Sequence, residues 1–231
     1  RLGMSLGINN LGSQKSCSYS CVYCQLGITS HKTMCRKSIF EPKNLLKNVV
    51  EHINKLNPNN LPDYLTLVAN GEPTLDVNLG EEIHQLKKTG IPVALITNST
   101  LFDMADLRES AMEADWVSVK VDSVDEAAWR KINRPYIWLD LDKILNGLSL
   151  FAKQFRGELH TETMLVEAYN NSKDTIKNTA SFIAGLSPES AYLSVPTRPP
   201  PIKGIQAVSE SRLMKAWTPL SKKRTFVTSR S

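Results

Sequence analysis

The sequence predicts an α/β protein, a partial (β/α)6 TIM-like barrel in which six parallel strands are surrounded by outer helices. Strand-like and helix-like segments alternate along most of the 231 residues, and no hairpin-type turn separates two strands. Such alternation is typical of a parallel sheet covered by helices. Six repeats fall short of the eight that close a full barrel. The composition, 41% hydrophobic and 22% charged, is that of a globular domain. No run of about 18 apolar residues predicts a membrane span.

Local patterns support each of the first three strand–helix units. A strand is expected at 4–9, and Pro42 then suits the first turn of a helix. Apolar residues at helical spacing continue this helix: Leu45, Leu46, Val49, Val50, Ile53 and Leu56. The next strands are expected at 64–69 and 92–97, and the next helices at 77–88, which Gly90 ends, and at 105–113.

The second half of the chain repeats this alternation. Strands are expected at 116–121, 159–166 and 191–195, and helices at 125–132, 141–155 and 173–186. A proline-rich run at 197–201 ends the regular pattern. We therefore expect a core domain over 1–204 and a C-terminal extension over 205–231, with one helix near 209–217.

Three cysteines lie close together, as Cys17, Cys21 and Cys24 in the spacing C-x3-C-x2-C. Three thiolates on one short loop can hold a soft metal centre and leave it one ligand short. An iron–sulfur cluster is favoured, because structural zinc sites usually combine two knuckles and the sequence has no second C-x2-C. Zinc with Cys35 or His31 as fourth ligand, and inert thiols, are the alternatives. Few cysteines and no leader-like segment predict a reducing, cytoplasmic location.

Polar residues interrupt strands that a buried parallel sheet would fill with apolar ones. On the strand at 116–121 the valines share one face, while Ser118, Lys120 and Asp122 share the other. Glu162 lies on the next strand, and Arg198 follows the last one. Because buried charges need partners or ligands, we interpret this set as the lining of a hydrophilic binding cavity. A plain salt bridge from Lys120 to Asp122 or Glu162 is the alternative.

Two further strands end in polar residues, one at Asn70-Gly71-Glu72-Pro73 and the other at Asn98. A glycine just past a strand lets the backbone approach a ligand closely, and a neighbouring carboxylate can accept hydrogen bonds from an ammonium group. Such a tripeptide is often a plain turn. Its place at the C-terminal end of a strand, where the sites of such barrels gather, favours a binding role.

With these motifs the chain resembles the radical S-adenosylmethionine (radical SAM) superfamily. Cys17, Cys21 and Cys24, with Tyr23 before the last cysteine, are similar to its cysteine signature. Asn70-Gly71-Glu72-Pro73 is similar to its Gly-Gly-Glu motif, with Asn in place of the first Gly. The resemblance covers residues 4–200. A narrower likeness, to an Fe–S oxidoreductase subgroup related to wyosine-type tRNA-modifying enzymes, rests on three segments: 6–10, 23–27 and 71–75.

The resemblance implies a [4Fe-4S] cluster held by the three cysteines, with S-adenosylmethionine (SAM) bound at its open iron. It implies that SAM is cleaved reductively to a 5′-deoxyadenosyl radical that abstracts hydrogen from a substrate. By position, the implied cofactor contacts are Tyr23, Asn70, Gly71, Glu72, Pro73, Asn98 and Ser118. The catalytic candidates are the other cavity residues: Lys120, Asp122, Glu162 and Arg198.

The resemblance also implies partners. It implies a one-electron donor of flavodoxin or ferredoxin type, and it favours a tRNA base as substrate, which the net charge of +5 permits without requiring it. A radical SAM enzyme that modifies a peptide or protein is the second expectation. A non-catalytic iron–sulfur or zinc module is the third, and the charged cavity argues against it, because an electron carrier has no need of such a cavity.

Overall fold

The computed structural model of the chain describes residues 2–209 and 226–228, and in them it forms one parallel sheet. The strands follow the chain order from β1 to β7 across the sheet. They are β1 (Ser5–Ile8), β2 (Tyr64–Leu67), β3 (Val93–Thr97), β4 (Trp116–Lys120), β5 (Glu158–Met164), β6 (Ser190–Ser194) and β7 (Phe226–Thr228). The helices are α1 (Pro42–Ile53), α2 (Leu79–Lys87), α3 (Ala105–Met112), α4 (Glu126–Asn133), α5 (Leu141–Gln154) and α6 (Lys173–Leu186).

This arrangement confirms the predicted partial barrel and each of its six strands. Every expected helix of the core is also present, with ends shifted by a few residues at most. The structure adds β7, a strand that the sequence did not predict and whose Val227 pairs with Tyr192 of β6. It therefore brings part of the segment 205–231 into the sheet. The helix expected near 209–217 lies, beyond Ser209, outside the described residues.

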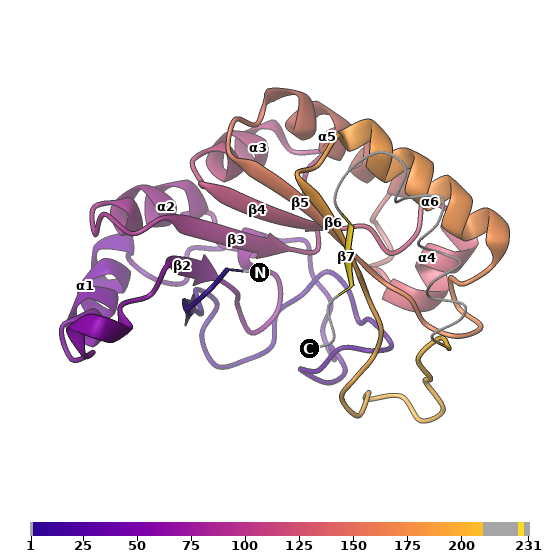
Figure 1. Cartoon of the computed structure of the whole chain (residues 1–231), viewed down its shortest axis with the longest axis horizontal. Helices are drawn as coiled ribbons and strands as arrows, with labels where there is room; N and C mark the ends of the chain where they lie inside the picture. Colours follow the sequence, from indigo (N-terminus) through magenta and orange to yellow (C-terminus); the bar gives the residue numbers. More distant parts are fainter. Residues whose placement is uncertain (1, 210–225, 229–231) are drawn as a thin grey trace.

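The sheet is curved, and its two sides carry different parts of the chain. Helices α1, α2, α3, α5 and α6 run along one side, whereas the connection between β1 and α1, coloured indigo to purple, lies on the other (Figure 1). Within the described residues, none of the helices is both long and apolar enough to span a membrane.

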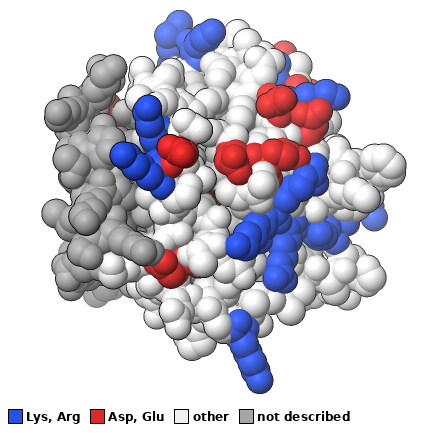
Figure 2. Space-filling model, turned by 90° about the vertical axis from the view of Figure 1, so that its right-hand side faces the viewer, with Lys and Arg blue, Asp and Glu red and all other residues white. Residues whose placement is uncertain are grey.

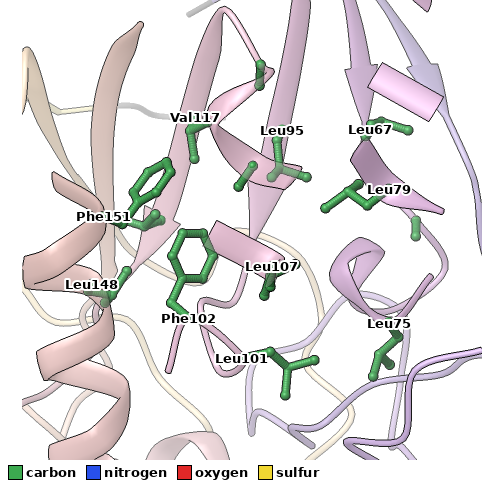
Figure 3. Close-up of a cluster of buried hydrophobic side chains, with 14 of the residues drawn as sticks. Leu67, Leu75, Leu79, Leu95, Leu101, Phe102, Leu107, Val117, Leu148 and Phe151 are labelled. Carbon is green, nitrogen blue, oxygen red and sulfur yellow. The ribbon is translucent and has the colours of Figure 1, made fainter. Parts of the chain in front are cut away.

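The main hydrophobic core fills the space between the sheet and the outer helices. Figure 3 shows Leu95 and Val117 of the sheet beside Phe102 and Phe151. The two phenylalanine rings meet edge to face, with centroids 4.9 Å apart. Val117 thus packs toward the helices, as the alternation of valines in β4 predicts. Alternate residues of the same strand are left to face the side where the cysteine segment lies.

Candidate cluster and cofactor site

The cysteine segment is held by backbone hydrogen bonds to two distant parts of the fold. The amide of Ser16 donates to the carbonyl of Asn70, just past β2, over 3.0 Å. The amides of Ser20 and Val22 donate to the carbonyls of Asn133 and Ile132, at the end of α4, also over 3.0 Å. The loop is therefore fixed between the C-terminal end of β2 and the end of α4, although it contains neither helix nor strand.

Gly71 is required by this attachment. Its φ is 140°, and a Cβ atom built on it would lie 1.6 Å from the carbonyl oxygen of Ser16. The two residues form a parallel bridge, and the amide of Glu72 donates to that same oxygen over 2.9 Å. The sequence predicted that this glycine lets backbone approach a ligand. The structure shows a close approach of two backbones, which sets the position of Cys17.

Each sulfur of the three-cysteine motif accepts a hydrogen bond from a side-chain N–H group. Asn98 Nδ2 donates to Cys17 Sγ over 3.4 Å, and it also donates to Ser18 Oγ over 3.0 Å. The other two donors are Asn133 Nδ2, 3.3 Å from Cys21 Sγ, and Lys15 Nζ, 3.3 Å from Cys24 Sγ. Such donors stabilise negative charge on sulfur.

The three thiols fit an iron–sulfur cluster. Burial raises the pKa of Cys17 and of Cys21 to about 12, with smaller contributions from Glu72 at Cys17 and from Asp122 at Cys21. A raised pKa keeps these thiols protonated at neutral pH, and a bound cation such as iron would supply the positive charge that deprotonates a coordinating thiol. In the described part of the chain no three His, Cys, Asp or Glu side chains converge on one metal ion. A four-iron cluster binds each thiolate at a different iron, so its ligands need not converge in that way.

The Glu72 carboxylate joins the ends of β2 and β3. It is buried, and its Oε1 accepts hydrogen bonds from the hydroxyls of Thr74, at 2.7 Å, and Thr97, at 2.5 Å. Its Oε2 accepts one from the amide of Asn98, at 2.6 Å. Burial raises the pKa of Glu72, and these hydrogen bonds oppose that rise. Because a carboxylate oxygen can accept more than one hydrogen bond, Oε2 can still accept one from an ammonium group.

Two other residues of the motif, Asn70 and Pro73, are hydrogen-bonded to the segment between β1 and the cysteines. Asn70 Nδ2 donates to the carbonyl of Gly12 over 3.1 Å, and the carbonyl of Pro73 accepts a 3.2 Å hydrogen bond from Asn10 Nδ2. These two hydrogen bonds connect the segment before the cysteines to the turn after β2.

Asp122 lies at the centre of a buried network behind Cys21. Its Oδ2 accepts hydrogen bonds from the hydroxyl of Tyr23 and, at 2.7 Å, from Asn133 Nδ2. Its Oδ1 accepts from the amide of Met164 over 2.8 Å. Burial is also the main reason why the pKa of Tyr23 is well above its usual value. The carboxylate thus fixes Tyr23 and Asn133, both of which adjoin cysteines of the motif.

Lys120 and Glu162 face each other across β4 and β5. Their Nζ and Oε1 atoms are 3.7 Å apart, and less than a fifth of either side chain is exposed. The Lys120 ammonium also lies 5.1 Å from the centroid of the Tyr23 ring, and Ser194 Oγ donates to Glu162 Oε1 over 3.3 Å. Ser118 is buried on β4, two residues before Lys120. The salt bridge that the sequence left open therefore exists, between Lys120 and Glu162.

Arg198 and Cys35 lie outside these groups. Arg198 Nη1 donates to Gln25 Oε1 over 2.8 Å, so that the segment after β6 meets the residue after Cys24. Cys35 is exposed, and so is His31.

Two of the three sulfur donors were not found by sequence reasoning. Lys15 lies two residues before Cys17, and Asn133 ends a helix more than a hundred residues further on. Lys15 and Asn133 belong to no sequence motif, and only the folded structure shows that they donate hydrogen bonds to the cysteine sulfurs. Asn98 was predicted as a cofactor contact, and the structure shows that its side chain also donates a hydrogen bond to Cys17 Sγ.

Comparison with known proteins identifies the family. The model of the Radical SAM superfamily matches residues 13–183. The chain belongs to this superfamily. Radical SAM enzymes use a [4Fe-4S] cluster and SAM, so the chain carries the core of such an enzyme.

Relatives and solved structures agree with this assignment. A UPF0026 protein of Methanocaldococcus jannaschii is 50% identical over 206 residues, which are 89% of the chain. The chain spans 64% of that relative, less than two thirds of its length. SuiB of Streptococcus suis bound to SAM has a TM-score of 0.69 at 12% identity, over 99% of the chain and 51% of SuiB. TYW1 with a lysine–pyruvate adduct bound has a TM-score of 0.68 at 16% identity, over 93% of the chain and 72% of TYW1. These two likenesses show the shared fold.

Proposed function

We propose that the protein is a radical SAM enzyme that abstracts hydrogen from a base of tRNA in the cytoplasm. The observation that supports the radical chemistry is the three-thiol loop, in which every sulfur accepts a hydrogen bond from a side-chain N–H group. When bound, the cluster supplies the electron that cleaves SAM to the 5′-deoxyadenosyl radical. The protein supplies orientation, electrostatics and exclusion of water.

The residues of the site divide by what they contact. We assign the cluster to Cys17, Cys21 and Cys24. We assign SAM to the ends of β2, β3 and β4 and to the cysteine loop: Tyr23, Asn70, Gly71, Glu72, Pro73, Asn98 and Ser118. Among these, Gly71 and Asn70 act by fixing the cysteine segment, whereas Glu72 Oε2 is the group suited to the SAM ammonium.

The substrate side of the site is formed by Lys120, Glu162 and Arg198. Lys120 and Glu162 present a proton donor and an acceptor side by side at the ends of neighbouring strands. Asp122 acts as a positioning residue, because both of its carboxylate oxygens accept hydrogen bonds from the protein.

A tRNA base is supported by the resemblance of the cysteine and Gly-Glu-Pro segments to wyosine-type tRNA-modifying enzymes and by the fold shared with TYW1. The net charge of the chain gives the tRNA proposal little support of its own. On the face shown in Figure 2, acidic and basic side chains lie beside one another, so the net charge of +5 is not gathered there into one basic surface.

The radical chemistry is tested on anaerobically reconstituted protein. It should be brown and bind about four irons per chain, and with dithionite and SAM it should release 5′-deoxyadenosine. Cys21→Ala should abolish both the full iron content and the product. Colourless protein with stoichiometric zinc and no iron would refute the cluster.

The substrate is tested by comparing nucleosides from the tRNA of cells with and without the gene. The loss of one modified nucleoside, restored by the wild-type gene and not by Cys21→Ala, is the expected result. Unchanged nucleosides would overturn the tRNA assignment and favour a peptide or protein substrate.

A further inference from the structure

Two large apolar side chains are exposed at the turn between α4 and α5. Ile137 and Trp138 are 72% and 73% exposed, although Pro135 and Leu139 on either side of them are buried. The amide of Leu139 donates to the carbonyl of Tyr136 over 3.0 Å, so Ile137 and Trp138 occupy the two central positions of a turn. Turns favour Gly, Pro, Asn, Asp and Ser. The turn itself therefore does not require an isoleucine or a tryptophan at its tip.

The backbone of this turn is attached to the three-cysteine loop and the segment that follows it. The amide of Tyr136 donates to the carbonyl of Ser18 over 2.8 Å. Lys32 Nζ donates to the carbonyls of residues 134 and 135 over 2.9 and 3.0 Å. Because α5 leads back to the start of β5, α5 begins at the C-terminal edge of the sheet. Trp138 is therefore held at the same edge of the sheet as the proposed cluster ligands.

Arg134, which follows the last residue of α4, adds a cation to this turn. It is exposed, and within the described residues no carboxylate forms an ion pair with it. Its backbone is left-handed, with a φ of 47°, a conformation for which helix ends favour Gly or Asn. The nearest carboxylate along the chain, that of Asp140, accepts a hydrogen bond from the amide of Lys143. The Arg134 guanidinium can therefore bind an anion such as a phosphate.

An unpaired nucleotide fits this combination of an exposed ring and a cation. Proteins recognise single-stranded RNA by stacking its bases on aromatic side chains and by binding its phosphates with Arg or Lys. A protein partner fits less well, because a stable protein interface covers about 800 Å² on each side. Burial of one tryptophan covers only about 150–250 Å², which is enough for one base.

We propose that the turn at 134–138 binds an unpaired nucleotide of the tRNA substrate, with its base stacked on Trp138 and its phosphate bound to Arg134. The proposal rests on the proposed function, which supplies tRNA as the substrate, and it adds a contact to the strand beside the reacting base. Because the turn is hydrogen-bonded to the cysteine loop, the nucleotide bound there is a close neighbour of the base that loses hydrogen.

Binding of a labelled tRNA transcript to the full chain tests this contact. Wild type, Trp138→Phe, Trp138→Ala and Arg134→Gln are compared at several salt concentrations. Leu61→Ala is the matched control, because Leu61 is an exposed apolar residue that precedes β2, at the opposite edge of the sheet. Urea unfolding and iron content show whether each variant is folded.

Trp138→Ala should raise the Kd for the transcript about ten-fold, whereas Trp138→Phe, which keeps a ring, should raise it less and Leu61→Ala should leave it unchanged. Arg134→Gln should lower the salt dependence of binding by about one counterion. The transcript should also quench the tryptophan fluorescence of wild type, and Trp138→Phe should lose this quenching, because Trp116 and Trp129 are buried. A fully paired RNA duplex has no free base to stack and should quench little.

Other results overturn the proposal. Equal transcript binding by wild type and Trp138→Ala, or equal quenching by the transcript and the duplex, would exclude the stacked base and leave the proposed function standing. A wild-type dimer that Trp138→Ala converts to monomers in sedimentation velocity would show that the turn joins two copies of the chain instead. If wild type binds no transcript and the tRNA nucleosides are unchanged without the gene, the proposed tRNA substrate fails, and this site fails with it.

Discussion

A buried carboxyl group beneath the motif after β2 should make the stability of the protein depend on pH. Glu82, on α2, is fully buried. Its Oε2 accepts a 2.8 Å hydrogen bond from Asn10 Nδ2, which also donates to the carbonyl of Pro73. Within the described residues, Glu82 Oε1 has no hydrogen-bond partner. Burial raises the pKa of Glu82 from 4.5 to about 7, and Asn10 opposes the rise.

The sign and size of the effect follow from the two pKa values. The folded protein binds the proton more tightly than the unfolded chain does, so the stabilisation is complete below about pH 4.5 and is lost as the pH rises through about 7. Each pKa unit is worth about 1.4 kcal/mol, so the loss amounts to about 3 kcal/mol. Glu82→Gln keeps the size of the side chain and cannot ionise. The free energy of unfolding of Glu82→Gln should therefore equal that of wild type near pH 4.5 and exceed it by about 3 kcal/mol at pH 8.

Urea unfolding at several pH values between 4.5 and 8 measures this difference, and titrations elsewhere in the protein cancel in the comparison. Glu81→Gln, at an exposed neighbouring position on the same helix, is the control and should show no such trend. A constant difference between Glu82→Gln and wild type across the whole range would refute the reasoning.

The backbone contact and the sulfur donors lead to further predictions. Gly71→Ala should abolish iron binding, because its Cβ would overlap the backbone before Cys17, with atoms 1.6 Å apart; iron content after reconstitution measures this, and normal loading would contradict it. Gly185→Ala, whose Cβ meets nothing within 4 Å on α6, should load iron normally and raise the free energy of unfolding by about 0.5–1 kcal/mol in urea. Asn133→Ala removes the 3.3 Å hydrogen bond to Cys21 Sγ and should lower the reduction potential of the cluster. A redox titration followed by electron paramagnetic resonance measures the potential, and an unchanged value would exclude tuning by this donor.

The fold was predictable from the sequence because its evidence is local. The apolar spacing that runs from Leu45 to Leu56, or the alternation of valines in β4, determines an element within a few residues. The strand β7 was not predictable, because three residues beyond a long proline-containing segment show no period. Neighbours in sequence cannot reveal which distant strand such a short segment pairs with.

The residue types of the candidate site were predictable from the sequence, whereas the contacts between these residues were less so. The three cysteines stand out by spacing, whereas Asn133 reaches Cys21 through the packing of α4 against the loop. Asp122 was predicted as a cavity residue because its strand parity places it there. Its actual partners, Tyr23 and Asn133, come from other parts of the chain, and no pattern within β4 encodes them.

The origin of the three sulfur donors has a consequence for the order of biosynthesis. Lys15 leaves the ribosome with the cysteines, Asn98 follows after β3, and Asn133 follows after β4. Because the strands lie in the sheet in the order in which they are made, each can pair with its predecessor as soon as it emerges. A nascent chain that has not yet reached Asn133 has the three thiols but lacks the donor to Cys21. The hydrogen bond to Cys21 Sγ can therefore form only after β1 to β4, the part of the sheet that precedes Asn133, have been made.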